Sequence, residues 1–333
     1  MKILFFSPPR EDYLAATILH GLRSLPGVES WDVPRYDCVY RNFPRERLAS
    51  LHGKGFTLFG LLPETDLWRP GSAAMADPQA FDLVIFSSLW DQTRLFAQHQ
   101  PALAPEKTVL LDGSDDEAVP PWAGPWFRRP REFLKLRTLS RFAIWKREWT
   151  PRSQRNLWHR LPFFPARLRP RPRGLFPISF GIPEEKIVSG PPAKTKDFPV
   201  HIVDGELRFT LKAGSAGHVF SSEEEYRRDL QSSRFGITMK RSGWDCLRHY
   251  EIAANGAVPC FRQLAEKPKT CAPHDLDETN SISYSSAENL MEKLRYLSDG
   301  KYRALQEGSL RWARANTTAR RVRGLLNALA VHG

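Results

Sequence analysis

The chain has 333 residues, more than the roughly 250–300 at which a single hydrophobic core stops growing, so we expect two domains. A hydrophobic share of 41% and a mean hydropathy of −0.45 are typical of a globular chain, and no apolar run approaches the ~20 residues that span a bilayer. The apolar run ILFF near the N-terminus is shorter than the ~7–15 residues of a signal-peptide core. We therefore expect a cytoplasmic protein that is at most peripheral at the inner face of a membrane.

The excess positive charge lies in one segment. The formal net charge is +12, and the residues from Arg128 to Arg173 carry 15 Lys and Arg against two acids. The rest of the chain, with 34 basic and 35 acidic residues, is nearly neutral. Because the segment is also rich in Trp and Phe, three interpretations fit: a solvated surface, docking to an anionic membrane or lipid-linked acceptor, and nucleic-acid binding. Nucleic acid is the least favoured, since no RNP, KH or zinc-finger pattern accompanies the charge.

Residues 1–125 predict an α/β domain of Rossmann type. KILFFS (2–7) is a buried strand ended by two prolines, and Glu11 and Asp12 then open a helix whose leucines recur at helical spacing. Three further apolar runs of strand length follow, at 28–33, 81–88 and 107–113. Strands that alternate with helices indicate a parallel sheet with covered faces.

The rest of the chain predicts a connection and a second domain. Residues 126–190 form a basic Pro/Arg/Trp-rich connecting segment, with an expected helix from Glu132 to Trp149, and residues 191–333 form a second Rossmann-like domain with terminal helices. The expected strands are 198–205, 234–240 and 257–261, and the expected helices are 223–233, 246–255, 285–300 and most of the remainder to Ala330. The predicted fold class is α/β, with two Rossmann-like lobes that face each other across a cleft.

The stretch GWDCLRHYEIAANGAVPCF (243–261) places a cation and a carboxylate on one face of a helix. Residues three apart share a helical face, so Arg248 and Glu251 point the same way. Asp245 is the expected N-cap, and Gly256 suits the left-handed position after the helix end. The helix should begin beside the carboxyl end of the preceding strand, where open α/β sheets bind ligands.

This helix start predicts a site for a nucleotide-sugar. A helix N-terminus presents free N–H groups and about half a positive charge, and Lys240 and Arg248 add two full cations that suit a diphosphate. Asp245 and the backbone of residues 243–247 are expected to contribute to the same nucleotide-sugar site. Glu251, one turn deeper, can accept hydrogen bonds from two adjacent hydroxyls of a sugar. The alternative interpretation is a surface ion pair between Arg248 and Glu251, worth about 0.2–0.5 kcal/mol.

The stretch RHYEIAANGAVPCF resembles a signature in the second domain of GT-B glycosyltransferases, in which a glutamate precedes small apolar residues, a glycine and a Val-Pro strand. The resemblance runs from Glu223 to about Leu297, and the stretch is also similar to exostosin-like transferases. It implies that Glu251 holds the nucleotide ribose and that the basic residues before it hold the diphosphate. Many retaining members carry a first glutamate eight positions earlier, which is Gly243 here, so the resemblance does not fix the stereochemical outcome.

Two residues outside this helix are further candidates. Asp12 is the candidate catalytic base, because inverting GT-B enzymes often take a base from the first lobe near its first strand–helix loops. The alternative is an acid that only favours the helix dipole. His218 follows the loop Gly214-Ser215-Ala216-Gly217, which could approach a phosphate or a nucleobase and so contribute to nucleotide-sugar binding.

We expect no metal and no cofactor. The acids of LLDGSDD (110–116) lack Asp-x-Asp spacing, and the resemblance implies that protein cations hold the diphosphate, although Asp115 stays a candidate on the acceptor side. The four cysteines show no CxxC spacing and are interpreted as reduced thiols.

The resulting hypothesis is a metal-independent glycosyltransferase that moves a sugar from a nucleotide-sugar donor to a glycan or lipid-linked acceptor of the cell envelope, as in polysaccharide biosynthesis. Residues 128–173 would bring the protein to an anionic membrane surface. The alternative is a non-catalytic binding protein of similar architecture that uses the basic segment to bind nucleic acid or another anionic partner.

Overall fold

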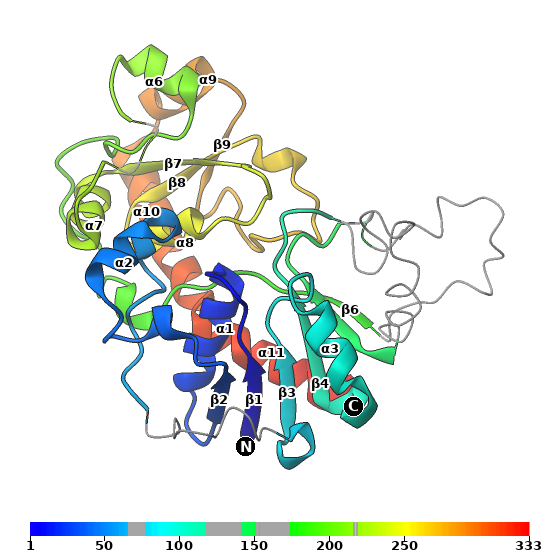
Figure 1. Cartoon of the computed structure of the whole chain (residues 1–333). Coiled ribbons are helices and arrows are strands. Elements are labelled where there is room, and N and C mark those ends of the chain that lie inside the picture. The colour runs from blue at the N-terminus through cyan, green and yellow to red at the C-terminus, as the bar shows by residue number, and fades with distance from the viewer. Residues whose placement is uncertain are drawn as a thin grey trace, which may run out of the picture.

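The computed structural model describes residues 1–65, 77–117, 141–150, 153, 174–215, 217 and 219–332, with side chains up to residue 330. Within these residues the chain forms two lobes, each built on a parallel sheet (Figure 1). Over the described ranges, the first sheet has six strands in the order β2-β1-β3-β4-β5-β6, and the second has three in the order β7-β8-β9. The expected α/β class with two lobes and C-terminal helices is confirmed.

The first sheet is organised around the apolar strand β1 (Lys2–Phe6), whose residues after Lys2 are all buried. It pairs with β2 (Glu29–Val33) on one side and with β3 (Leu83–Phe86) on the other, so the strand order reverses between β1 and β3. At such a switch point the carboxyl ends of the strands leave a place for ligands. Between residues 13 and 112 the chain also forms the α-helices α1 (Tyr13–Arg23), α2 (Arg45–Ser50) and α3 (Thr93–His99) and the strand β4 (Thr108–Asp112).

Two strands of the first sheet come from the segment that we expected to connect the lobes. β5 (Ala143–Lys146) pairs with β4, and β6 (Gly174–Pro177) pairs with β5, so the first lobe extends past residue 125. The helix predicted to end at Trp149 is wrong in its described part, because these residues form β5. The apolar run that makes this buried strand is only four residues long, and the surrounding Lys and Arg concealed it.

The second lobe contains most of the elements that its sequence predicts. Its strands are β7 (Phe235–Met239), β8 (Val258–Arg262) and β9 (Ile282–Tyr284), and its helices are α6 (Gly205–Leu211), α7 (Glu223–Ser232), α8 (Leu247–Ala254) and α9 (Ala287–Arg295). The strand predicted at 198–205 is wrong. Asp204 caps α6 by accepting hydrogen bonds from the backbone of Glu206 and Leu207, which ends the extended segment before it can add to the sheet.

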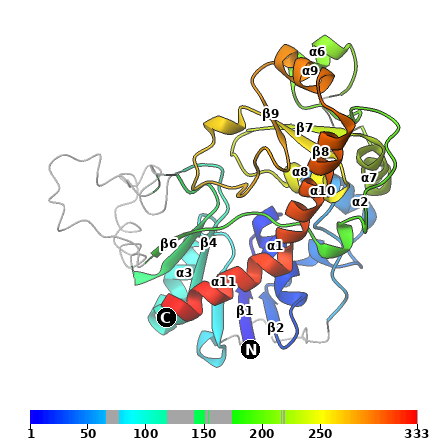
Figure 2. The same ribbon diagram turned by 180° about the vertical axis from the view of Figure 1, so that it is seen from behind.

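The two terminal helices join the lobes. α10 (Asp299–Ala315) packs on α8 and β8 in the second lobe, and α11 (Thr318–His332) continues over the first lobe, where it packs on α1 (Figure 2). His20 of α1 contacts the Thr318 hydroxyl at 2.8 Å, and Val322 is fully buried in the core. The described part of the chain holds no helix with the length and apolar character needed to cross a membrane.

Candidate functional site

The candidate site is centred on α8, whose first turn lies at the carboxyl end of β7. Figure 1 places α8 on the side of the second lobe that faces α1 of the first lobe. The helix begins at Leu247 with Cys246 as its N-cap, and Gly256 takes the left-handed conformation expected after its end, with a φ of 69°. The predicted helix is therefore confirmed, with its start displaced by one residue from the expected cap.

Asp245 has a different role from the one that its sequence position predicts. Its carboxylate is buried and accepts a hydrogen bond from the Phe180 backbone at 2.8 Å and another from the Tyr250 hydroxyl at 2.8 Å. It therefore does not cap α8, and both oxygens are engaged within the protein rather than at the start of the helix. Burial raises the pKa of this carboxyl, and the nearby Arg147 charge opposes the rise.

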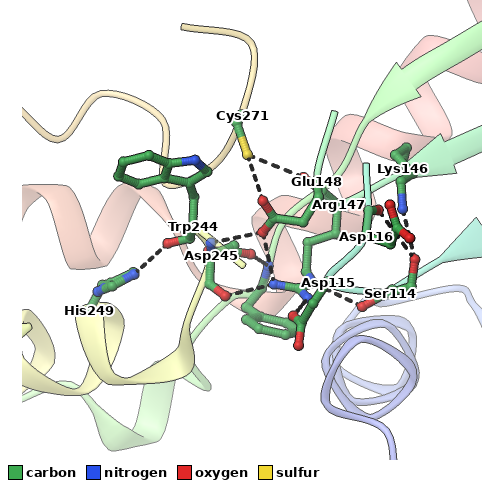
Figure 3. A network of polar contacts seen from close by, with 12 residues as sticks. Ser114, Asp115, Asp116, Lys146, Arg147, Glu148, Trp244, Asp245, His249 and Cys271 are labelled. Carbon is green, nitrogen blue, oxygen red and sulfur yellow. Dashed lines mark hydrogen bonds and ion pairs between the residues drawn. The ribbon is translucent and has the colours of Figure 1, made fainter. Parts of the chain in front are cut away.

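Two consecutive side chains of the first lobe hold the backbone of Asp245 (Figure 3). Arg147 Nη1 donates to the Asp245 carbonyl at 2.6 Å, and the Asp245 N–H donates to Glu148 Oε1 at 3.0 Å. Arg147 also donates to the Gly113 carbonyl at 3.0 Å. We call this set of contacts the Arg147 junction. It fixes the residue that precedes the N-cap of α8 to the carboxyl edge of the first sheet.

The Arg147 junction is buried and strongly charged. Arg147 and Glu148 are each 3% exposed, and the guanidinium also pairs with Asp115 and lies over the Phe180 ring at 4.7 Å. Burial alone lowers the pKa of Arg147, but the carboxylates of Asp245, Glu148 and Asp115 outweigh it, so the pKa is raised. A guanidinium in such surroundings stays charged.

The residue at position 243 has to be small for this junction to form. A Cβ atom on Gly243 would collide with the Glu148 carboxylate and would lie 3.0 Å from Asp115 Oδ1. A side chain here would push the first-lobe carboxylates away from the loop that leads into α8. Close packing against Glu148 and Asp115 therefore explains the glycine at position 243.

Lys240 and Arg248 both lie at the start of α8, as expected. Lys240 is exposed, and its Nζ lies 5.1 Å from the centre of the Trp244 ring. Arg248 is half-buried, and its Nη2 contacts His201 Nε2 at 3.3 Å. Lys240 directly follows β7, and Arg248 belongs to the first turn of α8, where the positive end of the helix dipole adds to its charge.

His249 holds the loop that connects Lys240 to Arg248. The His249 ring is fully buried, with Nε2 2.9 Å from the Trp244 carbonyl and Nδ1 2.7 Å from the Thr238 hydroxyl. Burial lowers the pKa of His249 to about 3, so the ring is neutral. Because a carbonyl can only accept, Nε2 carries the proton and Nδ1 accepts from Thr238. His249 thus ties the loop to β7.

Glu251 contacts both lobes. The Thr57 hydroxyl of the first lobe donates to Glu251 Oε1 at 2.5 Å, and the Tyr226 hydroxyl of α7 donates to Glu251 Oε2 at 2.8 Å. Burial raises the pKa of the Glu251 carboxyl, and the two hydroxyls oppose the rise by stabilising the ionised form. The carboxylate is half-buried and already receives two hydroxyl hydrogen bonds, one on each oxygen.

Asp12 lies on the first-lobe side of the same region. It is the N-cap of α1, where its Oδ1 accepts from the Ala15 N–H at 2.8 Å, and its Oδ2 lies 3.5 Å from the position of a Cβ on Gly113. Burial raises the pKa of the Asp12 carboxyl, opposed by the Ala15 N–H and by the charge of Arg147. A carboxyl with a raised pKa can accept and return a proton nearer neutral pH than an ordinary aspartate.

The structure therefore brings together most of the predicted residues. Lys240, Arg248 and Glu251 lie on or beside α8, and Asp12 lies near enough to Arg147 for the guanidinium charge to act on its carboxyl. Asp245 lies in the junction, and His218 is outside the described residues. Asp115 is half-exposed and paired with Arg147.

Sequence reasoning missed four partners of this site, of which Arg147, Glu148 and Thr57 belong to the first lobe and Tyr226 to the second. Arg147 and Glu148 were counted as members of a basic surface segment, and Thr57 and Tyr226 were not singled out. The available signal was the triplet Lys146-Arg147-Glu148 directly after a short apolar run, because charges at the carboxyl end of a buried strand are placed at the ligand-binding edge. The described residues show no group of three or more His, Cys, Asp or Glu arranged for a metal ion.

Comparisons of sequence identify no relatives. No protein-family model matches the chain, and no curated protein matches it.

Comparisons of structure give matches along the whole chain. HepE of Anabaena, solved in complex with UDP-glucose, superposes with a TM-score of 0.54 at 10% identity over 99% of this chain and 100% of that one. A glycosyltransferase from Rickettsia africae gives a TM-score of 0.51 at 10% identity over 99% and 98% of the two chains. The trehalose-6-phosphate synthase OtsA gives 0.51 at 13% identity over 99% of each chain. The chain therefore has the two-lobed GT-B fold that its sequence predicts.

Proposed function

We propose that this protein is a glycosyltransferase that transfers a sugar from a nucleotide-sugar to an acceptor bound by its first lobe. The observation that carries the proposal is the position of Arg248 and Glu251 on α8, a helix that follows a strand of a parallel sheet, with the Glu251 carboxylate bonded to Thr57 of the other lobe. Fold alone does not assign a reaction, so the proposed reaction is inferred from these side chains.

Each residue of the site has a chemical task in this proposal. Lys240, Arg248 and the first-turn N–H groups of α8 bind the diphosphate and stabilise the negative charge that builds up on it as the sugar leaves. Glu251 accepts hydrogen bonds from ribose hydroxyls. The binding of UDP and UDP-glucose by HepE is consistent with a nucleotide-sugar of this kind.

Asp12 is proposed as the base that removes the proton from the attacking hydroxyl. It lies at the start of α1 in the first lobe, where it is influenced by the charge of Arg147, whose guanidinium donates to the Asp245 carbonyl just before α8. Burial raises the pKa of the Asp12 carboxyl, which makes it a stronger base than an ordinary aspartate. Replacement by asparagine keeps the size of the side chain and removes the base, so transfer should fall about 100-fold or more while donor binding persists.

The acceptor is proposed to be a glycan or a lipid-linked intermediate of the cell envelope. The support is the basic, aromatic segment 128–173, most of which lies outside the described residues. Two cations of this segment cannot contribute to docking, because both are buried and paired. Lys146 pairs with Asp112, and Arg147 pairs with Glu148. Binding to vesicles that contain anionic lipid, compared with neutral vesicles, tests whether the other cations suffice.

The decisive experiment measures nucleotide binding. Calorimetry with UDP, GDP, ADP, CDP and dTDP should detect tight binding of at least one, and Glu251→Ala should weaken the best ligand by about tenfold or more, since a charged hydrogen-bond acceptor is lost. Glu224→Ala on the exposed face of α7 is the matched control and should leave binding unchanged. Retention on DNA without any nucleotide response would instead favour the binding-protein alternative.

A further inference from the structure

A loop of the first lobe reaches across to the second lobe and covers Glu251. We call residues 52–60 the Thr57 loop. Lys54 Nζ donates to the Phe220 carbonyl at 2.6 Å, and the Phe56 ring stacks on Tyr226 with 6.1 Å between ring centres. At the tip of these contacts the Thr57 hydroxyl donates to Glu251 Oε1.

The backbone of the Thr57 loop is unusual. Residues with positive φ occur at five positions, which are Gly53, Lys54, Gly55, Thr57 and Gly60. The φ of Thr57 is 74°, a conformation that is costly for a β-branched residue. Thr57 is nevertheless only 3% exposed, and its hydroxyl is aimed at a carboxylate of the other lobe. A costly conformation that delivers a hydroxyl to a proposed ligand-binding group points to function.

The contacts of Glu251 resemble those of a bound diol. One hydroxyl donates to each carboxylate oxygen, from Thr57 at 2.5 Å and from Tyr226 at 2.8 Å. Two adjacent hydroxyls of a ribose would make the same pair of bonds. Tyr226 belongs to the same lobe as Glu251 and can stay with it, whereas Thr57 belongs to a loop of the other lobe and can move away with that loop.

We propose that Thr57 competes with a ribose hydroxyl for the Glu251 carboxylate and thereby sets the affinity for nucleoside diphosphates. The inference rests on the proposed function, since it requires Glu251 to bind the ribose. A ligand that uses Glu251 has to displace the Thr57 hydroxyl. A ligand that occupies only the diphosphate position, such as inorganic pyrophosphate, does not.

The test compares Thr57 variants with and without the hydroxyl. Both Thr57→Val and Thr57→Gly remove the hydroxyl. The valine keeps the β-branched shape and the backbone strain, whereas the glycine relieves the strain of the left-handed backbone. Thr57→Ser keeps the hydroxyl and is the control. Dissociation constants are measured by calorimetry for the nucleoside diphosphate that binds best in the screen above, for its 2′,3′-dideoxy form and for pyrophosphate.

The expected result is specific to the ribose hydroxyls. The valine and glycine variants should bind the nucleoside diphosphate about three- to tenfold more tightly, the range that corresponds to one net hydrogen bond, with the serine variant unchanged. Affinity for the dideoxy form and for pyrophosphate should not change in any variant.

Three outcomes would overturn the inference or its premise. Unchanged or weaker binding of the nucleoside diphosphate by both hydroxyl-free variants means that Thr57 does not compete. Equal tightening for pyrophosphate means that the variants loosen the lobes in general rather than free Glu251. If the unaltered protein binds none of the nucleoside diphosphates, the proposed function itself fails, which separates that failure from the failure of the Thr57 proposal.

Discussion

Two polar contacts between the lobes near α8 differ in character. The Arg147 junction holds the backbone before α8 with buried charges, and its members at the centre are each 3% exposed. The Thr57 loop reaches Glu251, one turn further along, with a single hydroxyl and a strained backbone. The first contact combines several charge-assisted bonds in a dry environment, and the second is one bond at a half-buried carboxylate.

This difference assigns the two contacts different tasks. Separating buried charged partners leaves an uncompensated charge, so the Arg147 junction should persist through any ligand-binding cycle. A single hydroxyl can be exchanged for a ligand hydroxyl at little net cost. The start of α8 is therefore fixed to the first lobe, while the ribose side of the same helix can open.

The largest expected effect comes from breaking the Arg147 junction. Arg147→Met removes the guanidinium and leaves Glu148 and Asp245 buried without their cation, so the free energy of unfolding should fall by about 3–5 kcal/mol. Denaturant titration followed by tryptophan fluorescence measures this loss. Arg141→Met, an exposed arginine that precedes the same strand, is the control and should change stability by less than about 0.5 kcal/mol. Similar losses for both variants would remove the basis of the comparison.

A second prediction concerns the loop that the junction and His249 hold between them. The pKa of His249 in the folded protein is about 3, below the ordinary value of 6.5, so protons bind more readily to the unfolded chain. The contribution of His249 to the free energy of unfolding is therefore fully present above about pH 6.5. It is lost as the pH falls towards 3, at up to about 1.4 kcal/mol per pH unit.

His249→Gln isolates this effect. The variant should be less stable than the unaltered protein at pH 7 and should lose less stability between pH 7 and pH 4, so the two pH profiles converge. Denaturant titrations across this range measure the difference in free energy of unfolding between the variant and the unaltered protein. Burial also lowers the pKa of His274, to about 4, but His274 is present in both proteins and its contribution cancels in the difference. Parallel profiles would show that His249 is not held neutral in the folded protein.

The smallest effect is expected at the base of the Thr57 loop. Lys54→Met removes the bond to the Phe220 carbonyl but keeps the apolar stem of the side chain, so stability should fall by only about 0.5–1.5 kcal/mol. Thermal unfolding measures this change. A loss as large as that of Arg147→Met would mean that the loop contact is as permanent as the junction.

The parts of the site that lie on one helix could be predicted from the sequence. Arg248 and Glu251 are three residues apart, and Gly256 marks the end of the helix, so local spacing alone places them. The same local rules located the strands β1, β3, β4 and β7 to within one or two residues.

The contacts between the lobes could not be predicted in this way. Arg147 meets the carbonyl of Asp245 across 98 positions of sequence, and Thr57 meets Glu251 across 194, and neither pairing has a periodicity to detect. Asp245 is an example. Its position in the sequence predicts a helix cap, but in the structure its buried carboxylate accepts hydrogen bonds from Phe180 and Tyr250 instead. Charge counts misled for the same reason, since Lys146 and Arg147 are neutralised by partners from other segments.

The return of α11 to the first lobe has a consequence for how the molecule is made. Helix α11 supplies a layer over α1, so the first lobe stays incomplete until residues 318–332 have been synthesised. Cutting the protein between its lobes would strip the first lobe of this cover and would expose Ala319, Val322 and Leu325 on the apolar face of α11. The two lobes are thus separate in their sheets but form a single unit of assembly.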